Sequence, residues 1–164
     1  MSNEVVTEAE PVQGWLKPGP GIKWLLVVAG AIGLAAATQL TIEKIRLLSD
    51  PNYIPSCSLN PILSCGSVMS SPQAAAFGLP NSLIGIASFA AIVTIGMGLF
   101  AGATYRRWFW VGLQLGVIFG ICFIHWLIVQ SLYDIQKLCL YCMIAWIAMI
   151  PLFVGVTLFN LRTG

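Results

Sequence analysis

Four long apolar runs constrain the fold of this chain more than any other feature. They cover residues 22–40, 82–103, 109–130 and 139–161, and Lys23 is the one charged residue inside them. The shortest has 19 residues, which as an α-helix would extend about 28 Å and cross the hydrocarbon core of a bilayer. Because 58% of the 164 residues are hydrophobic and only 9% are charged, a soluble core of this size cannot bury them. The sequence therefore predicts an all-α membrane protein.

Short connections between the runs predict how the helices are arranged. Residues 104–108 and 131–138 join consecutive runs, so those helices should be antiparallel neighbours. We expect a four-transmembrane-helix bundle over residues 22–164, with a long external loop at 41–81 and a disordered cytoplasmic tail at 1–21. The alternative, a cleaved signal peptide with its core at 24–37, is weaker because apolar residues continue past the small-residue site.

Basic residues near the ends of the spans predict the orientation. Five lie on the side of the termini and three on the other side, which favours cytoplasmic termini and an external loop in a plasma or bacterial inner membrane. The five are Lys17, Lys23, Arg106, Arg107 and Arg162, and the three are Lys44, Arg46 and Lys137. A net charge of +2 from dispersed residues does not indicate a nucleic-acid surface.

Four of the five cysteines fall on the predicted external face. Cys57 and Cys65 lie in the long loop, whereas Cys139 and Cys142 open the fourth span. Three interpretations are open: two structural disulfides, a zinc site of four thiolates, or a redox relay. The eight-residue spacing is not the usual half of a zinc site, so we expect no metal. Cys122, alone in the third span, is expected to be a small packing residue.

The position of the second pair favours the relay. Free backbone N–H groups and the helix dipole at a helix N-terminus stabilise a thiolate, and a C-x-x-C closes too small a loop to stabilise the fold much. Cys142 should lie one turn deeper than Cys139, at membrane depth. A two-electron acceptor there should be flat and lipid-soluble, as a quinone is. We expect His125 to orient that quinone, to relay a proton, or simply to pack against a neighbouring helix.

An ordered set of motifs adds to the interpretation of the cysteines as a redox relay. Cys57 and Cys65 are followed by two serines at 70–71, by FGLPNSLIG at 77–85 and by CLYC at 139–142. In this order and spacing, over about residues 45–160, the chain resembles the vitamin K epoxide reductase (VKOR) family in its bacterial branch. The resemblance implies a bundle that surrounds a quinone, such as menaquinone or ubiquinone, capped by the loop and a short half-helix.

The resemblance also implies roles for the four cysteines. Cys139 and Cys142 match the active-site disulfide, with Cys142 beside the quinone. Cys57 matches the loop cysteine that accepts electrons from a partner, and Cys65 the one that passes them to Cys139. The implied partner is an extracytoplasmic thioredoxin-like (DsbA-type) protein, which we expect to be separate from this chain.

Two polar residues match the quinone site of the family, and one residue departs from it. Ser71 and Asn81 match a loop serine and a quinone-facing asparagine, although each could instead cap a helix. Trp146 stands where animal members carry a tyrosine, so it offers an N–H but no hydroxyl. This departure makes reduction of an epoxide a weaker expectation than binding of a quinone.

The function that the resemblance implies is oxidation of the thiol partner at the expense of the quinone, which supports disulfide formation. One alternative is the same chemistry run as a vitamin K epoxide or quinone reductase. A second is a non-enzymatic tetraspan scaffold with structural disulfides, supported by a G-x-x-x-G stripe that could form a dimer face or approach bundle neighbours. The stripe consists of Gly112, Gly116 and Gly120. The unrelated quinone-linked oxidase DsbB fits less well, because its two cysteine pairs occur in the reverse order.

Overall fold

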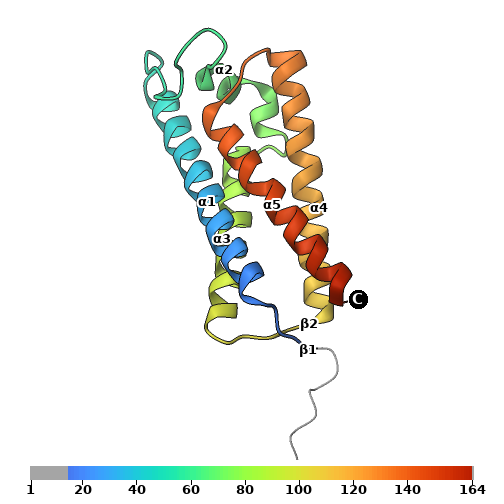
Figure 1. Ribbon diagram of the computed structural model, residues 1–164. Coiled ribbons are helices and arrows are strands. Elements are labelled where there is room, and N and C mark those ends of the chain that lie inside the picture. Colours follow the sequence, from blue (N-terminus) through green and yellow to red (C-terminus); the bar gives the residue numbers. More distant parts are fainter. Residues whose placement is uncertain (1–14, 164) are drawn as a thin grey trace, which may run out of the picture.

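Four membrane-length helices form the body of the protein in the computed structural model, which describes residues 15–163. The helices run alternately in opposite directions and lie side by side (Figure 1). They are α1 (Pro20–Ser49), α3 (Asn81–Phe100), α4 (Arg107–Val129) and α5 (Leu140–Thr163). α4 continues directly into a π-helical turn, η2 (Gln130–Ile135). The predicted all-α, four-helix membrane bundle is confirmed.

α1 is longer than the first predicted span. It begins at Pro20, directly after Gly19, as expected from the preference of proline for the first helical position. It ends at Ser49, so the prediction that residues 41–49 belong to the external loop is corrected. A helix satisfies its own backbone hydrogen bonds in water as well as in lipid, so the end of an apolar run need not end the helix. The loop that follows α1 covers only residues 50–80.

Close contact between α1 and α3 holds the centre of the bundle. A Cβ atom added at Gly33 would lie 2.3–2.5 Å from ring atoms of Phe89, and one at Gly96 would lie 2.7 Å from Val27. Small residues let helices approach closely, and this packing is a main source of helix association in lipid. α5 packs against both α1 and α4. The buried side chains meet in one core that includes Leu26, Ile92, Leu99, Val117, Leu152 and Val156.

A two-stranded sheet closes one end of the bundle. β1 (Trp15–Leu16) pairs antiparallel with β2 (Tyr105–Arg106), which lies in the turn between α3 and α4. The prediction of a disordered tail at residues 1–21 is therefore corrected from residue 15 onward, because residues 15–16 are paired and α1 has begun by Pro20. The remainder of that prediction, residues 1–14, lies outside the described residues.

The opposite end carries a cap built from the long loop (Figure 1). It contains α2 (Cys65–Ser70) and the 3₁₀ turn η1 (Pro72–Ala75). Pro72 cannot continue α2, and the extended backbone of Ser71 separates the two turns. Beyond η2, Gln136 adopts a left-handed conformation with φ of 53°, and this residue ends the helix before the chain turns into α5. The structure thus contains the expected loop and short helix.

Candidate functional site

A short backbone pairing joins the loop to the start of α5. Leu63 and Leu138 form an isolated parallel bridge. In it, Leu138 N donates to Ile62 O at 2.9 Å, and Ser64 N donates to Leu138 O at 3.0 Å. Cys139 directly follows Leu138, and Cys65 lies two residues after Leu63. The pairing therefore brings cysteines from the two predicted pairs together.

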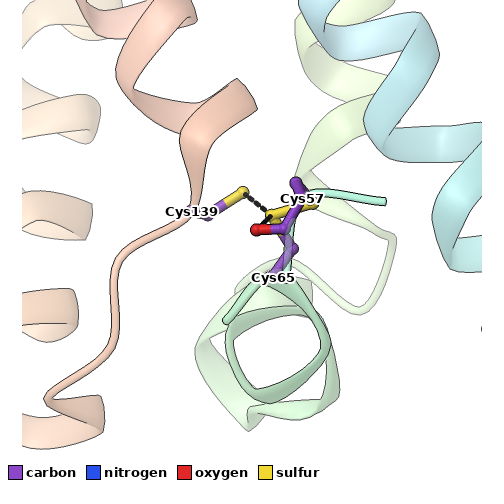
Figure 2. Close-up of side chains that lie close together, drawn as sticks. All are labelled: Cys57, Cys65 and Cys139. Atoms are coloured by element: carbon purple, nitrogen blue, oxygen red, sulfur yellow. Dashed lines mark hydrogen bonds between the residues drawn. A yellow bond between two sulfur atoms is a disulfide. The ribbon is translucent and has the colours of Figure 1, made fainter. Parts of the chain in front are cut away.

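Three sulfur atoms meet at this point (Figure 2). Cys57 and Cys65 form a disulfide, and Cys139 Sγ lies 3.2 Å from Cys65 Sγ. All three side chains are at most 1% exposed, and their sulfur atoms lie within 4.8 Å of one another. With Cys57 and Cys65 oxidised, two of the three sulfurs are not thiolate ligands for a metal. The arrangement suits exchange between the Cys57–Cys65 disulfide and the Cys139 thiol.

Cys139 and Cys142 stand one helical turn apart at the start of α5. Met143 N donates the first helical hydrogen bond to Cys139 O at 3.0 Å, so Cys139 occupies the N-cap position, directly before the first residue of α5. A hydrogen bond from the Cys142 side chain lowers the pKa of the Cys139 thiol most, and hydrogen bonds from the backbone N–H groups of Cys142 and Tyr141 lower it further. Together they lower the pKa of Cys139 although its burial opposes this. The lowered pKa raises the thiolate fraction of Cys139 and makes it a better leaving group in thiol-disulfide exchange.

An apolar cavity of about 390 Å³ lies inside the bundle below these cysteines. Cys142, Asn81 and Trp146 line one end of it, and its wall continues along α3 and α4 as far as Ile95 and Gly112. A second cavity of about 80 Å³ shares Cys142, Asn81 and Trp146 with the first. Of these two cysteines, Cys142 thus reaches the cavity while Cys139 contacts the loop disulfide.

The glycine stripe of α4 belongs to the wall of the larger cavity. Gly112, Gly116 and Gly120 all line it. A Cβ atom added at Gly112 or Gly116 would meet nothing within 4 Å, whereas one at Gly120 would lie 2.4 Å from Met149 of α5. Gly112 and Gly116 are exposed and border open space, whereas Gly120 lets α5 approach closely. The dimer face on this stripe stays a prediction.

Ser71 and Asn81 both lie at the smaller cavity, but their polar groups are engaged by the loop. Ser71 Oγ donates to Val68 O at 2.7 Å. Asn81 Nδ2 donates to Gln73 O at 2.7 Å, and Asn81 Oδ1 accepts from Ala76 N at 3.2 Å. Neither side chain makes a helix-capping hydrogen bond. Asn81 keeps one amide N–H and one oxygen lone pair for a further partner.

His125 and Cys122 lie on the outer face of α4. His125 is exposed, and its Nδ1–H donates to Ile121 O of its own helix at 2.7 Å. This hydrogen bond joins His125 to its own helix and not to a neighbouring one. His125 also lines neither of the two cavities described above. Cys122 is also exposed, so the expectation that it is a small packing residue is not met by contacts within the described bundle. An apolar run alone does not reveal which of its faces meets lipid.

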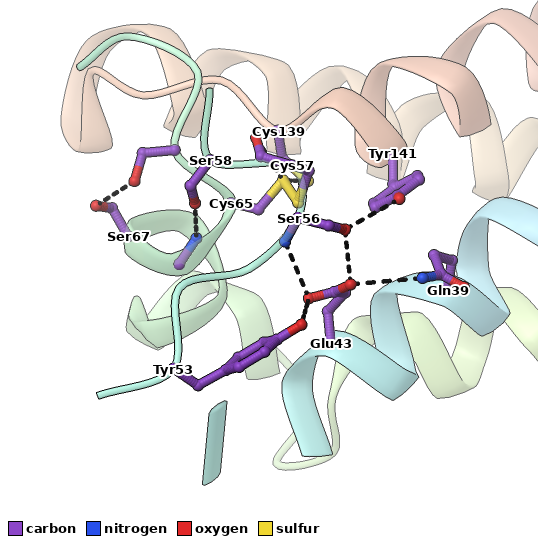
Figure 3. Close-up of a disulfide and its surroundings, with 12 residues drawn as sticks. Gln39, Glu43, Tyr53, Ser56, Cys57, Ser58, Cys65, Ser67, Cys139 and Tyr141 are labelled. Atoms are coloured by element: carbon purple, nitrogen blue, oxygen red, sulfur yellow. Dashed lines mark hydrogen bonds between the residues drawn. A yellow bond between two sulfur atoms is a disulfide. The ribbon is translucent and has the colours of Figure 1, made fainter. Parts of the chain in front are cut away.

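A polar cluster beside the disulfide was not predicted from the sequence. Glu43 of α1 is fully buried and accepts hydrogen bonds from the loop residues Tyr53 and Ser56 (Figure 3). Nearby, Lys44 Nζ donates to Met69 O at 2.6 Å and lines the smaller cavity. The available signal was an acidic residue, Glu43, directly after an apolar run. The sequence did not predict that Glu43 lies inside α1 rather than in the loop.

One comparison with known proteins identifies a family. The family model described as the vitamin K epoxide reductase family matches residues 24–157, which is most of the chain. A comparison with curated proteins found no match. The matched range includes all of α3 and α4, most of α1 and α5, the cap and the four cysteines of the site.

Proposed function

The chain belongs to the vitamin K epoxide reductase family, and from this premise we propose that it reoxidises an extracytoplasmic thioredoxin-like (DsbA-type) protein and passes the electrons to a membrane quinone. Family membership, four apolar helices and the close cysteines make it a membrane thiol-disulfide oxidoreductase. The proposal adds the direction of electron flow, the partner, and a quinone such as menaquinone or ubiquinone. It also adds an orientation with the cap outside and both termini in the cytoplasm.

The contact between Cys65 and Cys139 carries the proposal. Their sulfur atoms are 3.2 Å apart, although the residues are 74 positions apart in the chain. A disulfide bond is about 2.05 Å long, so a movement of about 1.2 Å would join them. Cys142, one turn further along α5, lines the apolar cavity. An electron pair can therefore pass from the loop to the cavity through two exchanges.

The first steps are thiol-disulfide exchanges at the cap. A thiolate of the partner attacks Cys57, which breaks the Cys57–Cys65 bond, and the partner's second thiol then releases a reduced loop. Cys65 thiolate attacks Cys139 of an oxidised Cys139–Cys142 pair, and Cys142 leaves as a thiolate. Cys57 next attacks Cys65, which restores the loop disulfide and frees Cys139. The structure, with Cys57–Cys65 oxidised and Cys139 and Cys142 free, corresponds to the state after this exchange.

The last step returns Cys139 and Cys142 to the disulfide. A quinone held in the cavity would supply the oxidising power for this step, since it can accept the two electrons and two protons that Cys139 and Cys142 lose on forming a disulfide. The cavity fits such a molecule in volume and character, since it is about 390 Å³ and mostly apolar. Asn81 and Trp146 supply polar N–H groups near Cys142, where a ring carbonyl would need a donor. Cys142 is the cysteine placed to react there, because it lines the cavity.

Quinol formation in membranes tests the proposal. Membranes that contain the protein are mixed with reduced thioredoxin-like protein and a soluble quinone analogue, and quinol is followed optically. We expect Cys142→Ala to reduce turnover to the background rate. The matched control is Cys122→Ala, which removes a cysteine on the outer face of α4 and should keep full turnover. Undiminished turnover in Cys142→Ala would contradict the relay, and no turnover in the unmutated protein would favour a scaffold.

A further inference from the structure

Glu43 is a buried carboxylate that the proposed electron path does not use. It lies on the part of α1 that extends beyond the first predicted span, and it is 0% exposed. Its oxygens accept four hydrogen bonds (Figure 3). Three of these come from the loop: Tyr53 OH at 2.8 Å, Ser56 Oγ at 2.7 Å and Ser56 N at 3.3 Å. The fourth comes from Gln39 Nε2 at 3.4 Å.

The hydrogen bonds have a definite direction and lead to both cysteine pairs. Ser56 Oγ donates its one proton to Glu43, so the contact of 3.3 Å between Ser56 Oγ and Tyr141 OH requires Tyr141 to donate. Ser56 directly precedes Cys57 in the loop, and Tyr141 lies between Cys139 and Cys142. Glu43 is therefore connected, through Ser56, to the loop disulfide and to the start of α5.

The burial of this carboxylate ties the loop to α1. A buried charge is unfavourable unless hydrogen-bond donors surround it, and here most of the donors come from residues 53–56. If the loop moved away, Glu43 would lose three of its four donors. Cys57 is 1% exposed, so a partner protein cannot attack it until the loop moves. The hydrogen bonds to Glu43 oppose that movement.

We propose that Glu43 is a positioning residue that holds the loop disulfide closed against Cys139. It acts through Ser56 and Tyr53, and it favours internal exchange between Cys65 and Cys139 over exposure of Cys57. For its role in turnover this inference rests on the proposed function. Its structural part, closure of the loop, requires neither a quinone nor a partner protein.

Two chemical probes test closure in the full chain in membranes. The first is the rate at which dithiothreitol reduces the Cys57–Cys65 disulfide, and the second is the rate of maleimide labelling at Cys139, read by peptide mass spectrometry. We expect Glu43→Gln to raise both rates about tenfold or more, the factor for one hydrogen bond to a charged group. The matched control is Asp50→Asn, since Asp50 also accepts a loop hydrogen bond, from Asn52 N, but this bond is exposed and involves neither Ser56 nor Tyr53. Both rates should stay within twofold in this control.

Coupling between Glu43 and Ser56 separates positioning from general loosening of the cap. In the double variant Glu43→Gln with Ser56→Ala, the rates should exceed those of the stronger single variant by less than twofold, because both changes break the same interaction. Multiplication of the two single effects would overturn the proposal. So would rates within twofold of the unmutated protein in Glu43→Gln, or an equal increase in Asp50→Asn.

Steady-state turnover distinguishes a positioning role of Glu43 from a loss of packing in the cap. With the thioredoxin-like protein as varied substrate, Glu43→Gln should lower kcat while KM does not rise, because internal exchange slows and Cys57 becomes easier to reach. A raised KM with unchanged kcat would overturn the positioning role. Absence of turnover in the unmutated protein would instead overturn the proposed function, and the two labelling rates would still decide whether Glu43 holds the loop.

Discussion

Cys65 and Cys139 should form a disulfide readily when their other partners are removed. In the variant Cys57→Ser with Cys142→Ser, they are the two cysteines that remain at the cap. Their sulfur atoms start 3.2 Å apart, and the bridge between Leu63 and Leu138 holds the two segments together. A shift of about 1.2 Å completes the bond. Little conformational freedom is left to lose when it forms.

The expected effective concentration follows from this pre-organisation. Groups joined by short flexible linkers meet at roughly millimolar effective concentration. Because this pair is held at contact distance, we expect a value about 10³-fold higher, equivalent to about 4 kcal/mol. The matched control is Cys65→Ser with Cys142→Ser, which leaves Cys57 and Cys139. These sulfurs also lie within 4.8 Å, but we expect their effective concentration to be at least about tenfold lower because they are not in the 3.2 Å contact.

Equilibration with glutathione measures both values. Membranes with each variant are incubated over a range of reduced and oxidised glutathione, quenched with acid, and analysed by a gel shift after labelling of free thiols. Cys122 remains in both variants and reports any disulfide between molecules. Equal effective concentrations for the two pairs, or a higher value for Cys57 with Cys139, would refute the reasoning that Cys65 is the loop cysteine that exchanges with Cys139.

Three further predictions follow from the site and the packing. A hydrogen bond from Cys142 lowers the pKa of Cys139, so Cys142→Ala should shift the pH profile of Cys139 alkylation to higher pH. Cys142→Ser should retain part of the effect. Identical profiles for Cys142→Ala and the unmutated protein would contradict this. Gly33→Ala should cost about 1–3 kcal/mol, seen in detergent unfolding, since the new Cβ meets the ring of Phe89, whereas Gly116→Ala should not destabilise the protein. Gly116→Leu should lower quinol formation by filling the cavity without slowing reduction of the loop disulfide, and unchanged turnover would argue against this cavity as the quinone site.

The sequence alone was sufficient for the membrane architecture. Four runs long enough to cross a bilayer leave few options, because backbone in lipid must satisfy its hydrogen bonds within a helix. The position of Cys139 and Cys142 at the start of the last helix could also be read directly, since one turn separates residues three apart. Both features depend on the composition and spacing of residues that are close together in the sequence.

The tertiary structure decided which groups meet. The 3.2 Å contact of Cys65 with Cys139 joins residues 74 positions apart, and it depends on how the loop folds back onto the start of α5. The same is true of Glu43, which falls within the predicted external loop at 41–81 but which α1 carries into a buried cluster with Ser56. Apolar periodicity gave no help within the bundle, because lipid-facing and core-facing side chains are equally apolar. The outward position of Cys122 and the cavity beside Cys142 therefore emerged only from packing of the four helices.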